Sequence, residues 1–121
     1  GGYQATQTLL TRTERETERP SALYVANEAM AVGALKALYD AGLRVPADFS
    51  LITTGDPPFA AYTIPALTTF SLPVYEAGQI ASRRLLEWLT LGKSGGEPLP
   101  PLNFSLKIRE SCRAYTRSLK P

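Results

Sequence analysis

Histidine is absent from the 121 residues, and cysteine occurs only once, as Cys112. These absences remove the Ser–His and Cys–His couples of nucleophilic enzymes, the usual proton carrier near neutral pH and most zinc sites. A lone cysteine also cannot form a disulfide within the chain, which suits a reducing compartment. The sequence therefore predicts that the chain is not an enzyme and has no cofactor and no metal site.

Long apolar runs and a strong charge of either sign are also missing. No stretch approaches the roughly 18 residues of a membrane span, and no secretion signal opens the chain. Thirteen Lys and Arg stand against eleven Asp and Glu, so the net charge of +2 is too small to hold a polyanion. We expect a cytoplasmic location, no membrane contact and no DNA contact by these residues alone.

The composition that is present is globular, with 44% hydrophobic and 20% charged residues. Apolar periodicity predicts helices over residues 2–12, 27–41 and 74–91, and strands over residues 22–26, 49–54, 67–72 and 102–109. This alternation predicts an α/β fold, a mostly parallel sheet with flanking helices. The continuous run 22–26 predicts a strand covered on both faces, whereas 102–109 alternates like a half-buried strand.

Local signals predict where the helices begin and end. Asn27 is a good N-cap for the second helix, and Gly42 ends it. The first helix is expected to run on as a solvated, charged end, with Arg12 and Glu16 paired, until Pro20 stops it. Farther along, Arg109, Arg113 and Arg117 are spaced by four and are expected to be solvated, and residues 114–121 to be a frayed tail.

The third helix has an apolar stripe that a small sheet cannot cover. It consists of Val74, Ala77, Gly78, Ala81, Leu85, Trp88 and Leu89. Leaving such a stripe wet would forfeit roughly 1.5–3 kcal/mol for each large side chain. We therefore expect this stripe to face a partner surface that the chain does not supply.

Several segments together carry a family resemblance. Residues 42–48 read Gly-Leu-Arg-Val-Pro-Ala-Asp, and residues 65–69 read Pro-Ala-Leu-Thr-Thr. With residues 21–35 and the closing Arg109-Glu-Ser111, they resemble the effector-sensing domain of the lactose-repressor/galactose-repressor (LacI/GalR) family of bacterial transcription regulators. The resemblance covers nearly the whole chain.

The resemblance implies a two-lobed sensor shaped like a periplasmic sugar-binding protein, with a small effector between the lobes. Residues 1–70 would be most of the second lobe, 71–105 would belong to the first lobe, and 106–121 would return to the second as a strand and tail. The helix-turn-helix that reads DNA would lie before Gly1, outside this chain. Relatives dimerise, so the resemblance also implies a homodimer, possibly one that exchanges segment 73–108.

The resemblance also places the candidate effector site. Asn27 stands where the family carries an effector-binding Asn or Asp before the second helix, and Glu28 stands where Asp is usual; an ordinary N-cap role for Asn27 is equally open. Gly55 replaces the acid that commonly grips the effector, and Asp56 matches that acid's neighbour. A slip of one residue would let Asp56 take its role. Leu72 falls where some relatives carry a polar contact, which would make this pocket more apolar.

Two other classes of function stay open. A solute-binding protein of a transporter shares the two-lobed shape and would carry a secretion signal where a regulator carries the helix-turn-helix. A small enzyme using Asp56 and Glu28 as acid and base would lack a metal, a histidine and a covering lobe. The sequence favours the regulator, and it identifies neither the effector nor the operator.

Overall fold

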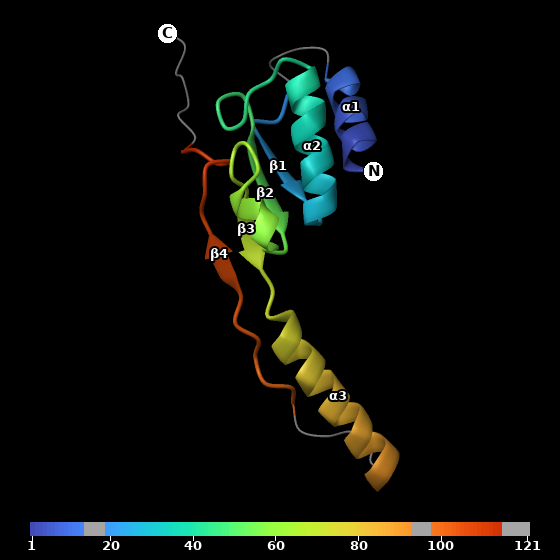
Figure 1. Ribbon diagram of the computed structural model, residues 1–121. Coiled ribbons are helices and arrows are strands. Elements are labelled where there is room, and N and C mark those ends of the chain that lie inside the picture. The colour runs from blue at the N-terminus through green and yellow to red at the C-terminus, as the bar shows by residue number, and fades with distance from the viewer. Residues whose placement is uncertain (14–18, 93–97, 115–121) are drawn as a thin grey trace. The chain divides into compact units, whose positions relative to one another are not determined.

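The computed structural model describes residues 1–13, 19–92 and 98–114, and within them the expected alternation of helices and strands is present. The elements in chain order are α1 (Gly2–Arg12), β1 (Ala22–Val25), α2 (Glu28–Asp40), β2 (Ser50–Thr54), the short 3-10 helix η2 (Pro58–Ala61), β3 (Thr68–Ser71), α3 (Val74–Leu91) and β4 (Ser105–Lys107) (Figure 1). The chain divides into two compact units, Gly1–Ser71 with Leu106–Pro121 and Leu72–Ser105. That the units are two lobes of a sensor stays a prediction.

The sheet is mostly parallel, as the sequence predicts. Its order is β1-β2-β3-β4. β1 pairs in parallel with β2, with Val25 opposite Thr53, and β2 pairs in parallel with β3, with Thr53 opposite Thr69. The carboxyl ends of three strands therefore meet at one edge, where open α/β sheets bind ligands.

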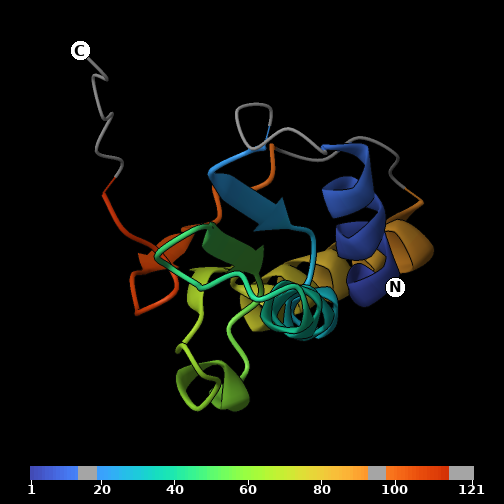
Figure 2. The same ribbon diagram turned by 90° about the horizontal axis from the view of Figure 1, so that it is seen from above.

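The core of the first unit lies between α2 and one face of the sheet. Figures 1 and 2 show α1 and α2 side by side, with α2 nearer the strands. The largest fully buried apolar side chains are Leu38, Leu51 and Leu67. Two glycines let the helices touch, since a Cβ on Gly2 would lie 2.0 Å from the Met30 carbonyl oxygen and one on Gly33 would lie 2.7 Å from the Tyr3 nitrogen. This close approach was not predicted from the sequence.

The predicted ends of α2 are confirmed. The Asn27 Oδ1 accepts a hydrogen bond from the Met30 backbone N–H at 2.9 Å, and Gly42 has φ +72°, which favours glycine. The Leu43 N–H then donates to the Leu38 carbonyl at 2.9 Å, a closing bond of the kind that follows a glycine stop.

The first helix and the first strand differ from expectation. α1 ends at Arg12 with Thr13 as its C-cap, so Pro20 does not stop it, and the expected Arg12–Glu16 pair lies outside the described residues. β1 is not covered on both faces within the first unit, because Ala22 and Tyr24 are exposed and alternate with the half-buried Leu23 and Val25. Tyr24, on the other face, is 67% exposed.

β4 also differs from the prediction, being shorter and exposed along its length. Only Ser105–Lys107 forms a strand, and all three residues are exposed, as are Phe104 and Ile108. The apolar alternation of 102–109 thus predicted a strand correctly, but not its burial. The predicted frayed tail falls almost entirely outside the described residues.

The second unit is dominated by α3, which ends at Gly92 with φ +60°. None of its residues is buried, and Leu85, Trp88 and Leu89 are at least half exposed. Within the described residues of the second unit, the large side chains of the apolar stripe are exposed, and the partner surface expected to cover them stays a prediction. No helix of the described residues is long and apolar enough to cross a membrane.

The returning segment after β4 is joined to β2 and β3 through the buried Ser111. Its Oγ donates to the Leu51 carbonyl at 2.6 Å and accepts from the Thr68 N–H at 2.7 Å. Its backbone N–H donates to the Ala66 carbonyl, and its carbonyl accepts from the Leu51 N–H. Ser111 thus satisfies backbone groups of two strands at once.

Replacing Ser111 by alanine should lower the free energy of unfolding by about 1–3 kcal/mol, because the Leu51 carbonyl and the Thr68 N–H would lose a buried partner. Urea denaturation followed by circular dichroism measures the change. Ser105→Ala, at an exposed position of β4, is the matched control and should change stability by less than about 0.5 kcal/mol. Equal effects of the two variants would contradict this role of Ser111.

Candidate functional site

The candidate site lies at the edge of the sheet where β1 and β2 end. β1 leads through Asn27 into α2, and β2 leads through Gly55 and Asp56 into η2. Because β1 and β2 are parallel and adjacent, these two loops emerge side by side. Five site residues were predicted, and the structure brings two of them, Glu28 and Gly55, close together in space. Asn27 precedes Glu28 in the sequence, and Asp56 follows Gly55.

Asn27 is exposed, and the oxygen of its side chain has a structural role. Its backbone is extended, with φ −152°, and its side-chain oxygen caps α2 through the Met30 N–H. The N-cap role is thus observed. Within the described part of the chain, its side-chain amide nitrogen donates no hydrogen bond, so a contact with an effector stays a prediction.

Glu28 lies against Gly55 across the two loops. A Cβ built on Gly55 would be 2.6 Å from the Glu28 Oε2 and 3.2 Å from its Cδ. Gly55 has φ +92°, a conformation that other residues rarely adopt, and its N–H donates to the Phe70 carbonyl at 3.0 Å. The carboxylate of Glu28 therefore takes the space that a side chain at position 55 would need.

Asp56 is held by three donors and is only 10% exposed. Its Oδ1 accepts from the Thr69 hydroxyl at 2.8 Å and from the Arg109 Nη2 at 2.7 Å, and its Oδ2 accepts from the Lys107 ammonium. With both oxygens engaged, Asp56 ties the loop after β2 to β3 and to the returning segment. This geometry gives no support to the one-residue slip in which Asp56 grips an effector.

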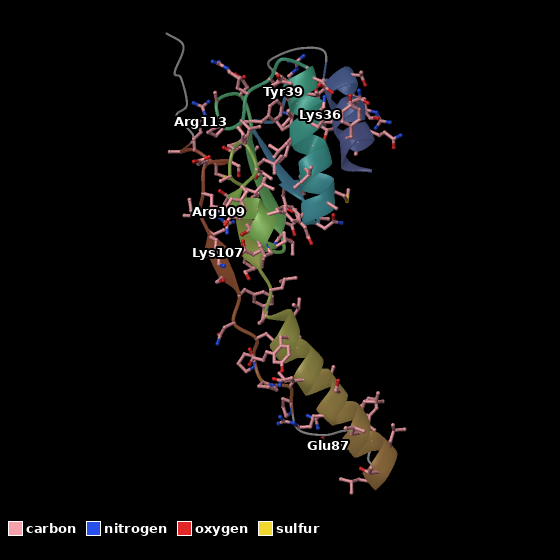
Figure 3. All side chains as sticks on the ribbon, viewed as in Figure 1. Lys36, Tyr39, Glu87, Lys107, Arg109 and Arg113 are labelled. Carbon is pink, nitrogen blue, oxygen red and sulfur yellow. The ribbon has the colours of Figure 1, made fainter. Side chains whose placement is uncertain are left out.

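Arg109 is a neighbour of the candidate site that the sequence did not predict. It was expected to be solvated, but its side chain is 20% exposed, and its Nη1 also donates to the Leu67 carbonyl at 2.7 Å. Figure 3 shows Lys107 and Arg109 on the returning segment, next to β3. Arg117 lies outside the described residues. The signal that points to Arg109 is the Arg-Glu-Ser segment of the family resemblance.

Leu72 opens the second unit and is half-buried, with its carbonyl accepting from the Val74 N–H at 2.8 Å. Each unit is described by itself, so its part in the site stays a prediction. Among the described residues, no group of three His, Cys, Asp or Glu side chains could hold a metal ion.

The Asp56 cluster lowers the pKa of that carboxyl from 3.8 to about 2. The hydrogen bond from Lys107 is the largest cause, burial opposes it, and the hydrogen bonds from Arg109 and Thr69 add to it. The carboxylate thus stays ionised through the physiological range, and it cannot act as a general acid there.

Comparison with known proteins identifies the family. A family model described as the periplasmic binding protein-like domain matches residues 1–112. The chain belongs to this family. The relatives with which it shares this domain are transcriptional regulators of the LacI type, as the resemblance implied, and their solved structures have the same α/β fold.

Three curated relatives illustrate the similarity. The transcriptional regulator AscG of Escherichia coli is 41% identical over 99 residues, covering 80% of this chain and 28% of the relative. Catabolite control protein A of Streptococcus mutans is 39% identical, covering 69% and 23%. The probable repressor ExuR of Bacillus subtilis is 32% identical, covering 95% and 33%. The chain therefore spans about a quarter to a third of the length of these relatives.

Solved structures of periplasmic binding protein-like regulators have folds similar to that of this chain. The E. coli repressor AscG has a TM-score of 0.74 at 34% identity, covering 93% of this chain and 39% of its own. The lac repressor dimer bound to operator also has a TM-score of 0.74, at 36% identity, covering 93% and 37%. A LacI-family regulator from Lactobacillus casei, solved with bound sucrose, has a TM-score of 0.71 at 31% identity, covering 92% and 39%.

The Asp56 cluster predicts acid sensitivity. Because the folded-state pKa lies below the unfolded one, the ionised carboxylate stabilises the fold fully above about pH 5, and this contribution is lost as the pH falls toward 2. It amounts to about 1–2 kcal/mol, since solvent screens the half-exposed Lys107. Asp56→Asn should remove that part of the pH dependence of the unfolding free energy, measured by urea denaturation from pH 2 to 6.

The matched control is Glu76→Gln, which removes an exposed carboxylate from the first turn of α3. It should retain the part of the pH dependence that Asp56→Asn removes. A wild-type curve that falls no more steeply than the Asp56→Asn curve would show that the cluster does not stabilise the fold.

Proposed function

We propose that the chain is the ligand-sensing and dimerisation portion of a LacI/GalR-type DNA-binding transcriptional regulator. The observation that carries the proposal is the agreement of sequence and fold with such regulators over at least nine-tenths of the chain. It would bind a small effector at the edge formed by Asn27, Glu28 and Gly55, between two lobes, and this binding would modulate operator binding.

The relatives, together with the polar edge formed by Asn27, Glu28 and Gly55, support a proposal for the class of effector. One relative is a ribose operon repressor, and an L. casei regulator was solved with sucrose and with glucose. We therefore propose a small, sugar-like metabolite as the effector. DNA would be read by a helix-turn-helix that is not among these residues, and the regulator would work in the cytoplasm, without a membrane partner.

A solute-binding protein of a transporter is the alternative, and it would have the same fold. The relatives named above are regulators, however, and they favour the regulator. These relatives also give no support to an enzyme. Any residues that the gene encodes before Gly1 would separate the classes, because a regulator would carry a helix-turn-helix there and an exported binding protein would carry a secretion signal.

Operator binding tests the function directly. The chain, expressed with any residues that its gene encodes before Gly1, should bind DNA from the region upstream of that gene, with a dissociation constant of roughly 10⁻⁸ M or tighter. Fluorescence anisotropy should show this affinity change when glucose, sucrose, ribose, nucleosides or sugar phosphates are added. A scrambled DNA of equal length is the control. Equal binding to both DNAs, or none of these compounds changing the affinity, would contradict the proposal.

Self-association is the second part of the proposal, and α3 is the segment that would supply it. Every residue of this helix is accessible, and the partner would cover the stripe through Leu85 and Leu89, with or without exchange of segment 73–108. Burying such leucines contributes roughly 1.5–3 kcal/mol each, which favours a dimer.

Charge placed in the stripe should separate the copies. The wild-type chain should sediment as a dimer at micromolar concentration, and Leu85→Glu with Leu89→Glu should sediment as a monomer while retaining the circular dichroism spectrum. Gln79→Glu, at an exposed polar position of the same helix, is the control and should stay dimeric. A monodisperse wild-type monomer would refute the role of α3.

A further inference from the structure

The first and second units are joined by two chain crossings. The chain leaves the first unit after Ser71, the last residue of β3, and it returns at Leu106, within β4. β3 and β4 are neighbours in the sheet. Two units that are linked by short crossings turn about those crossings, because hinges are a few residues at the ends of elements. The contacts made beside Ser71 and Leu106 therefore decide how freely such a turn occurs.

The loop after β2 is bonded to the outgoing crossing. The Gly55 N–H donates to the Phe70 carbonyl at 3.0 Å, and Phe70 immediately precedes Ser71. The Asp56 Oδ1 accepts from the Thr69 hydroxyl at 2.8 Å. Two successive residues of the loop thus hold two successive residues of β3, directly before the chain leaves the first unit.

The same loop is bonded to the returning crossing. The Asp56 Oδ2 accepts from the ammonium of Lys107, the residue that directly follows Leu106. The Asp56 Oδ1 also accepts from the Arg109 Nη2 at 2.7 Å. Hydrogen bonds between ionised partners are roughly twice as strong as those between neutral groups. The side chain of Asp56 therefore holds the residues that come directly after the return.

From this arrangement we infer that Asp56 is a positioning residue that holds both crossings at one point, with Gly55 completing the contact through its backbone. The hinge clamp, as we name it, consists of Gly55, Asp56, Thr69, Phe70, Lys107 and Arg109. Because both crossings are bonded to adjacent loop residues, loosening one of them loosens the other. In the proposed regulator, a function on which this last step alone rests, an effector at the neighbouring edge would act on both crossings through the clamp.

Hydrogen exchange of single backbone amides, measured by NMR on the chain, tests the clamp because it reports local opening. Lys107→Gln removes a half-exposed ammonium from the returning crossing and leaves Gly55 and Phe70 unaltered. The clamp requires this change to speed exchange of the Gly55 N–H, on the outgoing side. The expected factor is roughly two to five, the range that the loss of a partly exposed ion pair allows.

Asp56→Asn acts on both crossings at once, since it weakens the bonds from the two cationic side chains. It should speed exchange roughly tenfold. The increase should be similar at the Gly55 N–H and at the Arg109 N–H, which donates to the Thr68 hydroxyl oxygen at 3.0 Å. The Leu43 N–H, bonded to the Leu38 carbonyl at the end of α2, is the reference amide outside the clamp.

Asp48→Asn is the matched control. Asp48 also accepts from an arginine, through the Arg44 N–H at 2.7 Å and the Arg44 Nε at 3.3 Å, but it lies outside the clamp. This variant should leave exchange at Gly55 and Arg109 as in the wild type. A purely structural role of Asp56 would instead speed exchange at the reference amide and in the clamp by the same factor, through global unfolding.

Each outcome decides the inference. Gly55 exchange that Lys107→Gln leaves unchanged would overturn the coupling of the two crossings, and this variant still decides if Asp56→Asn does not fold. An increase at Arg109 without one at Gly55, or an equal increase at Leu43, would also overturn it. Neither an effector nor DNA enters the measurement, so its failure is distinct from a failure of the proposed function, which the operator-binding measurement decides.

Discussion

The contact between Asp56 and Arg109 is the constraint on which the described site depends. These residues are 53 positions apart, and their 2.7 Å ion pair joins the loop after β2 to the segment that returns after β4. Arg109 also binds the Leu67 carbonyl, and Ser111, two residues on, joins β2 to β3. Since Gly55 immediately precedes Asp56, this pair also fixes the backbone over which Glu28 lies.

The same contact explains why two acidic residues at one edge serve different purposes. Hydrogen bonds from three donors lower the pKa of Asp56 by more than burial raises it, and the pKa falls to about 2. The charge of Asp56 is therefore paired within the fold. Glu28 begins a helix, where a negative charge is favourable without any fixed partner. A fold that used both carboxylates internally would leave neither of them unpaired at this edge.

Local sequence signals predicted the features that depend on neighbouring residues. Asn27, Gly42 and Gly92 act within four or five positions, so the ends of α2 and the end of α3 could be read from the chain. The sequence predicted where the site lies but not which side chains are in contact there. Nothing local distinguishes Arg109, which is bonded to Asp56, from a solvated arginine, and only the fold shows that Glu28 meets Gly55, 27 positions away. The burial of β4 failed for a related reason, because alternation predicts a strand but not what covers it.

The candidate site and the second unit are connected through the chain itself. The first unit leads into the second at Ser71, directly after β3, and the chain returns through β4, whose last residue is Lys107. Lys107 binds Asp56, which is next to Gly55. The edge at Glu28 and Gly55 therefore lies one residue from a group that is bonded to this strand. A ligand bound at such an edge could shift a conformational equilibrium only through interactions that differ between the two states.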